Sequence, residues 1–342
     1  MKNKFINKKP FFIAEISANH GGKITNAKKL IDLAKKGGAD AIKLQTYTPD
    51  MMTLKDNKFV IKQGMWKTFN LWKLYNKAQT PLGWHKALFK YALKKKIKIF
   101  STPFTPEAVD FLENLNSKIY KVASFEMNDV NLIKKIAKTK KPMIISTGLS
   151  NLKEISKTVK IAKKYGCKDI TLLYCVSNYP SNINDFNLNN LTILKKKFNC
   201  RVGLSDHSIG SGLSCMAIIK GAVVIEKHIC LDNVKTVDSK FSLKGTEIKN
   251  FSKDIKNAFK IINKKNFTRS SSEMKNKIFK RSIYSITNIK KGDIFSLKNI
   301  RTYRPDLGLS ASYYLDLINK KAPFNISKNK PLSKNLKKIL KF

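Results

Sequence analysis

Acidic side chains are scarce in this sequence of 342 residues, which carries 23 Asp and Glu against 68 Lys and Arg and has a formal net charge of +45. Arginine is scarce too, because only five of these cations are Arg. Proteins that read nucleic-acid sequence favour the bidentate fork of arginine. The lysines are dispersed over expected helix surfaces, as at 94–96 and 195–197, which is typical of a solvated surface. We therefore predict no nucleic-acid partner; a non-enzymatic polyanion-binding protein, with steeply salt-dependent DNA binding, is the remote alternative.

Long apolar runs and paired cysteines are also missing. No run approaches the roughly 18 residues that cross a bilayer, and the apolar stretch 215–225 is interrupted by Lys220 and Gly221. The basic stretch 1–10 lacks the apolar centre of a secretory signal. The five cysteines are scattered with no C-x-x-C pair, which argues against a zinc knuckle and a disulfide framework. We expect a soluble cytoplasmic protein with reduced thiols and no membrane partner.

Short apolar runs rich in β-branched residues alternate with amphipathic segments along most of the chain. Alternation through about eight units is the signature of an α/β fold of the (β/α)8 (TIM) barrel type, of roughly 250 residues. The chain is longer than one such core, so we expect a second, smaller domain. The expected strands are 11–17, 41–47, 98–103, 119–124, 143–148, 171–177, 201–207 and 223–229.

The domain boundaries follow from this pattern. We expect a catalytic barrel domain over 1–262, a polar linker over 263–278 and a small β-rich domain over 279–342. The connection 48–82 is longer than a barrel requires and is rich in aromatic residues, which predicts a packed helical insertion over one mouth. Either a substrate lid or additional core would account for it.

Polar residues gather at the ends of the expected strands. Barrel enzymes build their sites at the carboxyl ends of the strands, so these side chains should converge on one mouth. They are Glu15, Lys43, Gln45, Thr102, Lys121, Ser124, Glu126, Ser146, Ser177, Tyr179, Ser205, His207 and, in the stretch 226–228, His228.

His207 and His228 end neighbouring strands, so their imidazoles can reach one metal ion. A single buried histidine is more often a hydrogen-bonded core residue than a ligand. Two of only four histidines at adjacent strand ends favour a metal site. Two nitrogen ligands completed by water and substrate oxygens suit a divalent ion such as Mn²⁺, with Mg²⁺ or Co²⁺ as alternatives, acting as a Lewis acid on a carbonyl.

Lys43 and Lys121 occupy inward-facing positions, where an unpaired ammonium is costly to bury. Each therefore needs an anionic partner, which a ligand phosphate or carboxylate could supply. An ion pair with Glu15 or Glu126 would serve equally well. The strand-end hydroxyls can complete an anion cradle, although a single serine there is more often a simple cap.

Several motifs resemble the sialic acid synthase family. They are F-F-I-A-E-I-S-A-N-H-G-G, I-K-L-Q-T-Y-T-P-D, F-S-T-P-F, K-V-A-S-F-E, I-S-T-G, C-V-S-N-Y-P, G-L-S-D-H-S and V-I-E-K-H. The tail, with R-S-I-Y and R-T-Y-R-P-D-L-G-L-S, is similar to the antifreeze-like (SAF) domain that follows the barrel in that family. The resemblance runs from about residue 10 to the end of the sequence.

Within the family, the K-V-A-S-F-E and D-S-K-F-S-L stretches look more like the enzymes that form pseudaminic acid than those that form N-acetylneuraminate or legionaminate. The resemblance implies a metal-dependent transferase. It would condense phosphoenolpyruvate with 2,4-diacetamido-2,4,6-trideoxy-L-altrose and water, giving pseudaminic acid and phosphate by C–O cleavage.

The resemblance also implies roles for matching positions. His207 and His228 would hold the metal, Glu15 would handle protons at the aldehyde or the attacking water, and Glu126 would be the second carboxylate. Gln45, Tyr179 and Asp238 would face the acceptor sugar. Phosphoenolpyruvate would be gripped by Lys43, Thr102, Lys121, Ser124, Ser146, Ser177 and Ser205.

The family's SAF domain crosses onto the partner subunit, so the resemblance implies a homodimer. Arg304 would then reach over the neighbouring barrel to the acceptor sugar, and Phe279 would line the same site.

Two other enzymes fit the same residues. A sister synthase would use N-acetylmannosamine or the legionaminate precursor, 2,4-diacetamido-2,4,6-trideoxymannose. A Schiff-base aldolase would use Lys43 or Lys121 as its nucleophile and would be trapped by borohydride.

Overall fold

The computed structural model describes residues 5–6, 10–262 and 266–342. The chain divides into two compact units, Met1–Lys264 and Lys265–Phe342. Each unit has a hydrophobic core of its own.

The first unit is a closed barrel of eight parallel strands, as the alternating pattern predicts. Each strand pairs with the next along the chain, and β1 also pairs with β8, which closes the sheet. A short β9 (Leu243–Lys244) pairs in parallel with the end of β8. The strands are β1 (Phe11–Glu15), β2 (Ala41–Thr46), β3 (Lys98–Pro103), β4 (Tyr120–Val122), β5 (Met143–Ser146), β6 (Ile170–Cys175), β7 (Arg201–Asp206) and β8 (Val224–Cys230).

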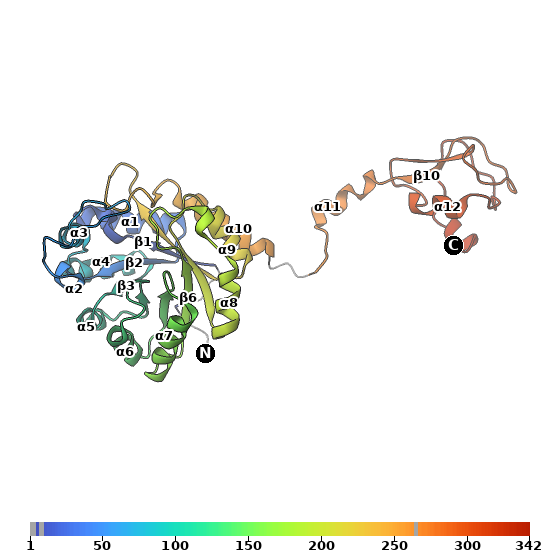
Figure 1. Cartoon of the computed structure of the whole chain (residues 1–342). Helices are drawn as coiled ribbons and strands as arrows, with labels where there is room; N and C mark the ends of the chain where they lie inside the picture. The colour runs from blue at the N-terminus through green and yellow to red at the C-terminus, as the bar shows by residue number, and fades with distance from the viewer. Residues whose placement is uncertain (1–4, 7–9, 263–265) are drawn as a thin grey trace. The chain divides into compact units, whose positions relative to one another are not determined.

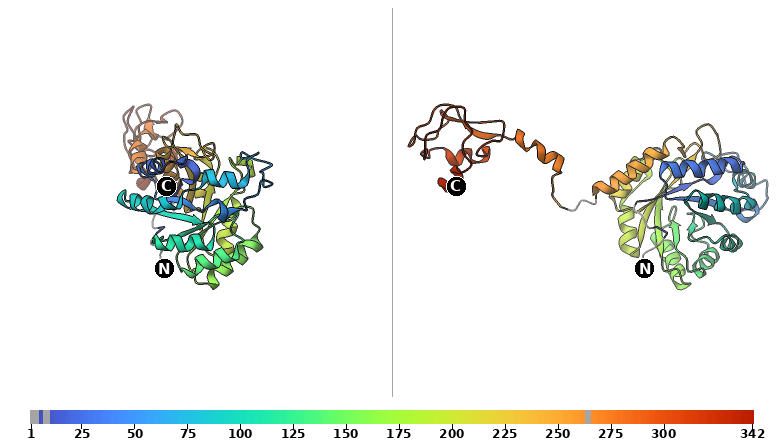
Figure 2. Two further views of the ribbon diagram at one scale, coloured as in Figure 1. Left: turned by 90° about the vertical axis from the view of Figure 1, so that its left-hand side faces the viewer. Right: turned by 180° about the vertical axis from the view of Figure 1, so that it is seen from behind.

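Helices form an outer layer around the strands (Figures 1 and 2). Their starts are encoded locally: Asn151 and Glu154 form a capping box at α7, and Thr105 caps α5 ahead of a proline. None of the helices in the described ranges is long and apolar enough to cross a membrane. The outer helices are α1 (Ile24–Gly37), α4 (Leu82–Lys94), α5 (Pro106–Asn114), α6 (Val130–Lys138), α7 (Leu152–Lys164), α8 (Asn189–Phe198), α9 (Gly212–Ile219) and α10 (Ile248–Ile262).

The interior of the barrel has two chemically different halves. Its amino-terminal half is filled by a buried apolar cluster that includes Phe11, Ile13, Phe100 and Val224. The ring of Phe5 packs against this cluster, 5.6 Å from the ring of Phe100. The apolar packing closes that end, so the polar interior side chains lie toward the carboxyl ends of the strands.

The insertion after β2 is helical only in part. It contains α2 (Pro49–Met52) and α3 (Leu71–Ala78), whereas the stretch between them is irregular apart from one bridge between Val60 and Asn70. Trp66 Nε1 donates a hydrogen bond to the Val237 carbonyl at 3.1 Å. The insertion is therefore anchored to the loop that follows β8.

The second unit is small and has less regular strand than we expected. β10 (Ser282–Ser285) and β11 (Ile300–Tyr303) form an antiparallel pair, and isolated bridges and short turns make up most of the rest. Ile283, Phe295 and Leu332 are among its buried core residues. Within the expected linker, 263–265 lie outside the described residues, and the rest includes the short helices α11 (Ser271–Lys275) and η3 (Asn276–Phe279). The remaining short helices are η1 (Ser17–His20), η2 (Ile183–Asp185), η4 (Ala311–Tyr313), α12 (Tyr314–Leu317) and α13 (Leu336–Ile339).

Gly203 lies where two neighbouring strands leave no room for a side chain. A Cβ atom there would lie 2.3 Å from the Val224 carbonyl oxygen and 2.6 Å from Leu173 Cδ2. We expect Gly203→Ala to lower the free energy of unfolding by about 1–3 kcal/mol through overpacking, measured as a lower thermal midpoint. Gly212→Ala is the control, because a Cβ there meets no atom within 4 Å. Equal midpoints for both variants would contradict the close approach.

Candidate active site

A ring of polar side chains lies inside the barrel at the carboxyl ends of the strands. Seven of the strands each contribute one of these buried residues. Side chains alternate between the two faces of a strand, and these residues are on the face that points into the barrel. The ring consists of Glu15, Lys43, Thr102, Lys121, Ser146, Ser205 and Glu226.

Glu226 is the centre of this ring. Its Oε1 atom lies 3.8 Å from the Nζ atoms of both Lys43 and Lys121. The Ser205 hydroxyl donates a hydrogen bond to the same oxygen at 3.1 Å. Our site prediction omitted Glu226, although it lies two residues before His228 on one strand, and the period of two could have identified it.

Lys43 and Lys121 have different surroundings. Lys43 forms an ion pair with Glu15 and donates to Thr102 Oγ1 at 3.1 Å. Lys121 donates to Ser146 Oγ at 2.6 Å and to the Val122 carbonyl at 3.0 Å. The anionic partners that the two lysines require are thus present in the protein, as Glu15 and Glu226.

Burial and charge act in opposite directions on these groups. Burial lowers the pKa of Lys121, whereas for Lys43 the nearby carboxylates outweigh burial and its pKa is raised. Burial raises the pKa of Glu15 to about 7, against the effect of Lys43. Burial also acts to raise the pKa of Glu226, but the two lysines outweigh it and lower the pKa. Glu15 is thus the carboxyl group of the ring that can hold a proton near neutral pH.

His207 and His228 lie next to the ring, with ring centroids 5.5 Å apart. His207 Nδ1 donates to the Val176 carbonyl at 3.1 Å, which leaves the lone pair on Nε2. Burial lowers the pKa of His207 to about 4 and that of His228 well below its ordinary value, so both imidazoles are neutral. The His228 Nδ1 atom is buried and has no hydrogen-bond partner among the described residues.

The other two histidines have structural roles. His20 accepts from the Gly22 amide and contacts Thr80 Oγ1, and His85 contacts Thr46 Oγ1 at 2.9 Å. The contrast separates the candidate ligands from histidines that only complete local hydrogen bonding.

The two neutral imidazoles fit a divalent metal ion, since a metal binds the neutral form and His228 has a buried nitrogen with no partner in the described ranges. No group of three or more His, Cys, Asp or Glu side chains suited to a metal occurs in the described part of the chain. Water and substrate oxygens would have to complete the coordination.

A small polar cradle adjoins the ring at the ends of β4, β5 and β6. The Gly148 amide donates to Ser124 Oγ at 3.2 Å, and Ser124 Oγ lies 3.0 Å from Cys175 Sγ. A Cβ atom on Gly148 would lie 2.3 Å from Ser177 Oγ. Ser124 and Ser177 therefore line one confined space, and Gly148 joins the residues that the sequence indicated.

The residues expected to contact the acceptor fall into two groups. Tyr179 packs against His207 and Trp66, with ring centroids 4.4 Å and 5.3 Å away. Asp238 is buried and accepts from Ser17 Oγ at 2.5 Å. Gln45 is half-buried on β2, two residues after Lys43. In the second unit, Phe279 and Arg304 are exposed.

These features define a barrel with one charged, metal-compatible mouth. Residues 30–267 match the NeuB family, and the chain belongs to this family, the sialic acid synthase family that its motifs resemble. The pseudaminic acid synthase of Campylobacter jejuni is 45% identical over 323 residues, which cover 94% of both chains. The pseudaminic acid synthase of Helicobacter pylori is 40% identical over 328 residues, covering 95% of this chain and 96% of the relative.

Relatives with other products are also similar. The N,N'-diacetyllegionaminic acid synthase of C. jejuni is 39% identical over 325 residues, covering 93% of this chain and 97% of the relative. Among solved structures, the N-acetylneuraminic acid (sialic acid) synthetase of Leptospira borgpetersenii superposes with a TM-score of 0.70 at 30% identity, covering 79% of this chain and 90% of that chain.

Glu126 provides a pH test of the site. Burial raises its pKa from 4.5 to about 7, although Lys121 opposes the shift, and its Oε2 atom has no partner among the described residues. Because the folded state keeps this proton after the unfolded chain has lost it, the stabilisation is complete below about pH 4.5 and is lost as pH rises through 7.

We expect Glu126→Gln, which is neutral at every pH, to escape this loss. The free energy of unfolding of this variant relative to the parent should rise between pH 4.5 and 7, reaching a gain on the order of 1–3 kcal/mol at pH 8. Thermal midpoints measured across this pH range check the trend. The exposed Glu273→Gln is the control and should show no such trend. If the difference in thermal midpoint between Glu126→Gln and the parent stayed constant from pH 4.5 to 8, the pKa of Glu126 in the folded protein would not be raised.

Proposed function

We propose that this chain condenses phosphoenolpyruvate with 2,4-diacetamido-2,4,6-trideoxy-L-altrose and water to form pseudaminic acid and phosphate. The observation that carries the proposal is the pair of buried lysines that share Glu226, next to two neutral histidines, in a member of the NeuB family. The similarity to two pseudaminic acid synthases supports the choice of acceptor.

The ring is suited to an anionic substrate. With Glu15 and Glu226 ionised, the two carboxylates balance Lys43 and Lys121. A proton on Glu15, whose pKa is about 7, leaves an excess positive charge and frees Lys43 from its ion pair. The phosphate and carboxylate of phosphoenolpyruvate would then bind to the lysines and to the hydroxyls of the ring. Thr102, Ser146 and Ser205 supply these hydroxyls, and Ser124 and Ser177 supply those of the cradle.

His207 and His228 would hold the divalent ion, for which Mn²⁺ is our first choice and Mg²⁺ or Co²⁺ the alternatives. When bound, such an ion supplies Lewis acidity at the aldehyde oxygen of the acceptor. His207 is oriented for this role by its hydrogen bond to the Val176 carbonyl.

Glu15 and Glu126 would handle the protons. Carbon C3 of phosphoenolpyruvate forms a bond to the aldehyde carbon, and the aldehyde oxygen gains a proton. Water adds to C2 and loses two protons, one of which balances the proton gained by the aldehyde oxygen, and the other leaves on the phosphate when the C2–O bond breaks. Both carboxyl groups have pKa values raised to about 7, which suits proton exchange near neutral pH. Gln45, Tyr179 and Asp238 would orient the acceptor.

The reaction is tested by phosphate release from phosphoenolpyruvate with Mn²⁺ and one of three acceptors: the altrose derivative, N-acetylmannosamine or the legionaminate precursor. We expect release with the altrose derivative and loss of release with a chelator. His228→Ala should reduce the rate by at least about 100-fold, in line with losses at metal sites. His85→Ala is the control, because it also removes a buried histidine but keeps the ligand pair.

Other results would change the proposal. Release with another acceptor alone would keep the mechanism but replace the substrate, and the similarity to a legionaminic acid synthase makes that the second candidate. Chelator-insensitive turnover with a borohydride-trapped lysine adduct would favour an aldolase. No release with any acceptor would refute the synthase.

We also propose a homodimer in which Arg304 and Phe279 complete the site of the partner subunit. Both side chains are exposed on the second unit, which has its own core. Exposed side chains on a separate compact unit are available for such a contact.

Subunit complementation tests the dimer. His228→Ala and Arg304→Ala chains, each nearly inactive alone, are coexpressed. If Arg304 acts in the partner's barrel, mixed dimers regain one intact site of two, so roughly a quarter of parent activity returns for random pairing. No recovery in purified mixed dimers would show that Arg304 does not act across subunits.

A further inference from the structure

A cleft lies at the end of the barrel opposite the polar ring. Its volume is about 1040 Å³, and its lining comes from the amino-terminal ends of strands β3 to β8 and the loops that precede them. This end of a barrel ordinarily serves stability rather than binding. The volume is at the upper end of the range for small-molecule sites, roughly 300–1,000 Å³.

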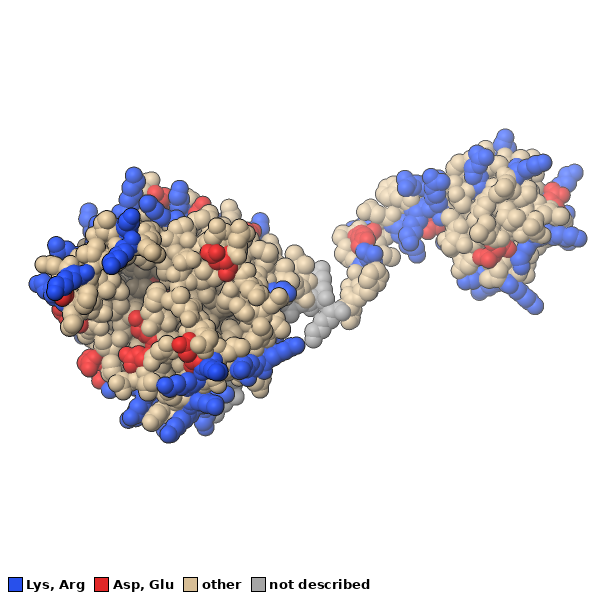
Figure 3. Space-filling model, in the orientation of Figure 1, with Lys and Arg blue, Asp and Glu red and all other residues tan. Residues whose placement is uncertain are grey.

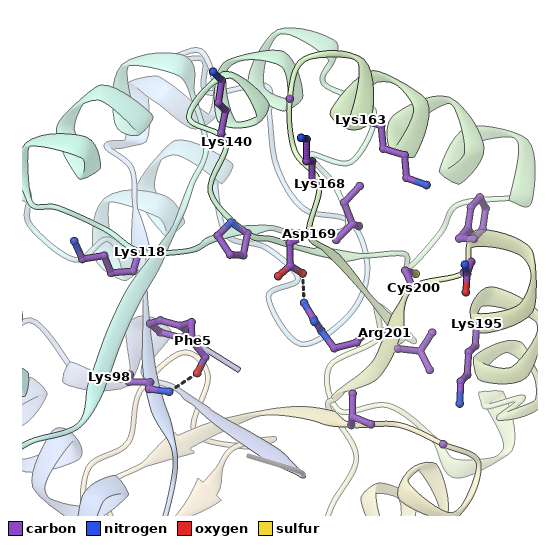
Figure 4. Close-up of a pocket in the computed structure, with 18 residues that line it drawn as sticks. Phe5, Lys98, Lys118, Lys140, Lys163, Lys168, Asp169, Lys195, Cys200 and Arg201 are labelled. Carbon is purple, nitrogen blue, oxygen red and sulfur yellow. Dashed lines mark hydrogen bonds and ion pairs between the residues drawn. The ribbon is translucent and has the colours of Figure 1, made fainter. Parts of the chain in front are cut away.

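The lining of this basal cleft is strongly cationic. Among its 18 residues, seven are Lys or Arg, whereas the whole chain has 68 in 342, or about one in five. Figure 4 shows these side chains around the opening, with the Asp169–Arg201 ion pair between them. Asp169 is the one carboxylate of the lining and is already paired. The cations are Lys98, Lys118, Lys140, Lys163, Lys168, Lys195 and Arg201.

Chance and helix dipoles account for only part of this charge. The surface is basic in general, and Figure 3 shows Lys and Arg along the margins of the visible face of the first unit and scattered over the second. Lysines in the last turn of a helix also complement its negative end. Only Lys163 and Lys195 occupy such positions, in α7 and α8. The other five cations lie on strand starts and loops.

Five lysines of the cleft have charges that no described carboxylate pairs with. Lys118, Lys140, Lys163, Lys168 and Lys195 are exposed and form no ion pair with a described carboxylate. Placing like charges around one concavity destabilises the protein, and a bound anion offsets that repulsion. A chain of several phosphates carries several negative charges near neutral pH, because each phosphate group is anionic, and these lysines can offset them.

The walls of the cleft also have an apolar part. Phe198, Val202 and Val223 line it together with the lysines. A ligand that combines several phosphates with a flat apolar group would use both kinds of surface. We propose that the basal cleft binds a multiply phosphorylated small molecule, with nucleoside triphosphates as the class that fits it. This inference does not depend on the proposed reaction, because the ring lies at the other end of the barrel.

Calorimetric titration of the full-length protein with ATP and with inorganic tripolyphosphate tests the site. We expect saturable binding with one molecule per chain. The variant K163E/K168E/K195E should weaken binding about tenfold or more, because it reverses three of the five unpaired charges. The control K29E/K36E/K86E changes the net charge equally on exposed parts of α1 and α4 and should weaken binding by less than about threefold. Circular dichroism and thermal midpoints verify that both variants fold.

The ligands and a competitor distinguish the outcomes. Tighter binding of ATP than of tripolyphosphate would assign a role to the apolar wall, and equal binding would show recognition of the phosphate chain alone; both support the site. Displacement by excess phosphoenolpyruvate would place the ligand at the catalytic mouth and overturn the proposal. Equal weakening in the two variants, non-saturable binding, or binding of long DNA without binding of triphosphates would also overturn it.

Discussion

Two ammonium groups share one buried carboxylate oxygen inside the barrel, and the rest of the mouth is arranged around this contact. The Nζ atoms of Lys43 and Lys121 each lie 3.8 Å from Glu226 Oε1. Removing one partner from such a cluster would leave an uncompensated charge in a low-dielectric interior, which is strongly destabilising. The hydroxyls of Thr102, Ser146 and Ser205 and the second carboxylate, Glu15, are therefore needed to bury the lysines at all. When a ligand binds, its anionic groups can take the place of these internal partners next to the lysines.

The barrel separates its two ends by chemistry. The apolar cluster around Phe11 and Phe100 fills the amino-terminal half, so the charged ring is reached from the carboxyl end, where Trp66 and Tyr179 lie close to His207. Cations gather at both ends, but they differ in their pairing. At the mouth the lysines have carboxylate neighbours within the protein, whereas among the described residues of the basal cleft the single carboxylate, Asp169, is paired with Arg201.

The sequence was informative about elements and about residues close to one another along a strand. The eight strands were predicted within a few residues, because buried parallel strands read as short β-branched runs. Ser124 was placed inside a strand, but β4 ends at Val122, so it lies in the following loop. Glu226 was missed because it was considered with Lys227 and His228 as one polar stretch. Its direction into the barrel depends on the strand period.

Local sequence alone determined the repeating strand and helix pattern, the family motifs and the two histidines at neighbouring strand ends, because each depends on residues close together in the chain. Only the tertiary structure decided that Glu226 bridges two lysines from other strands, that His20 and His85 are already hydrogen-bonded while His228 has a buried nitrogen without a partner, and that seven cations surround one cleft. These properties depend on distances between distant parts of the chain. Burial and pairing, which set the charge of each group, arise when the sheet closes.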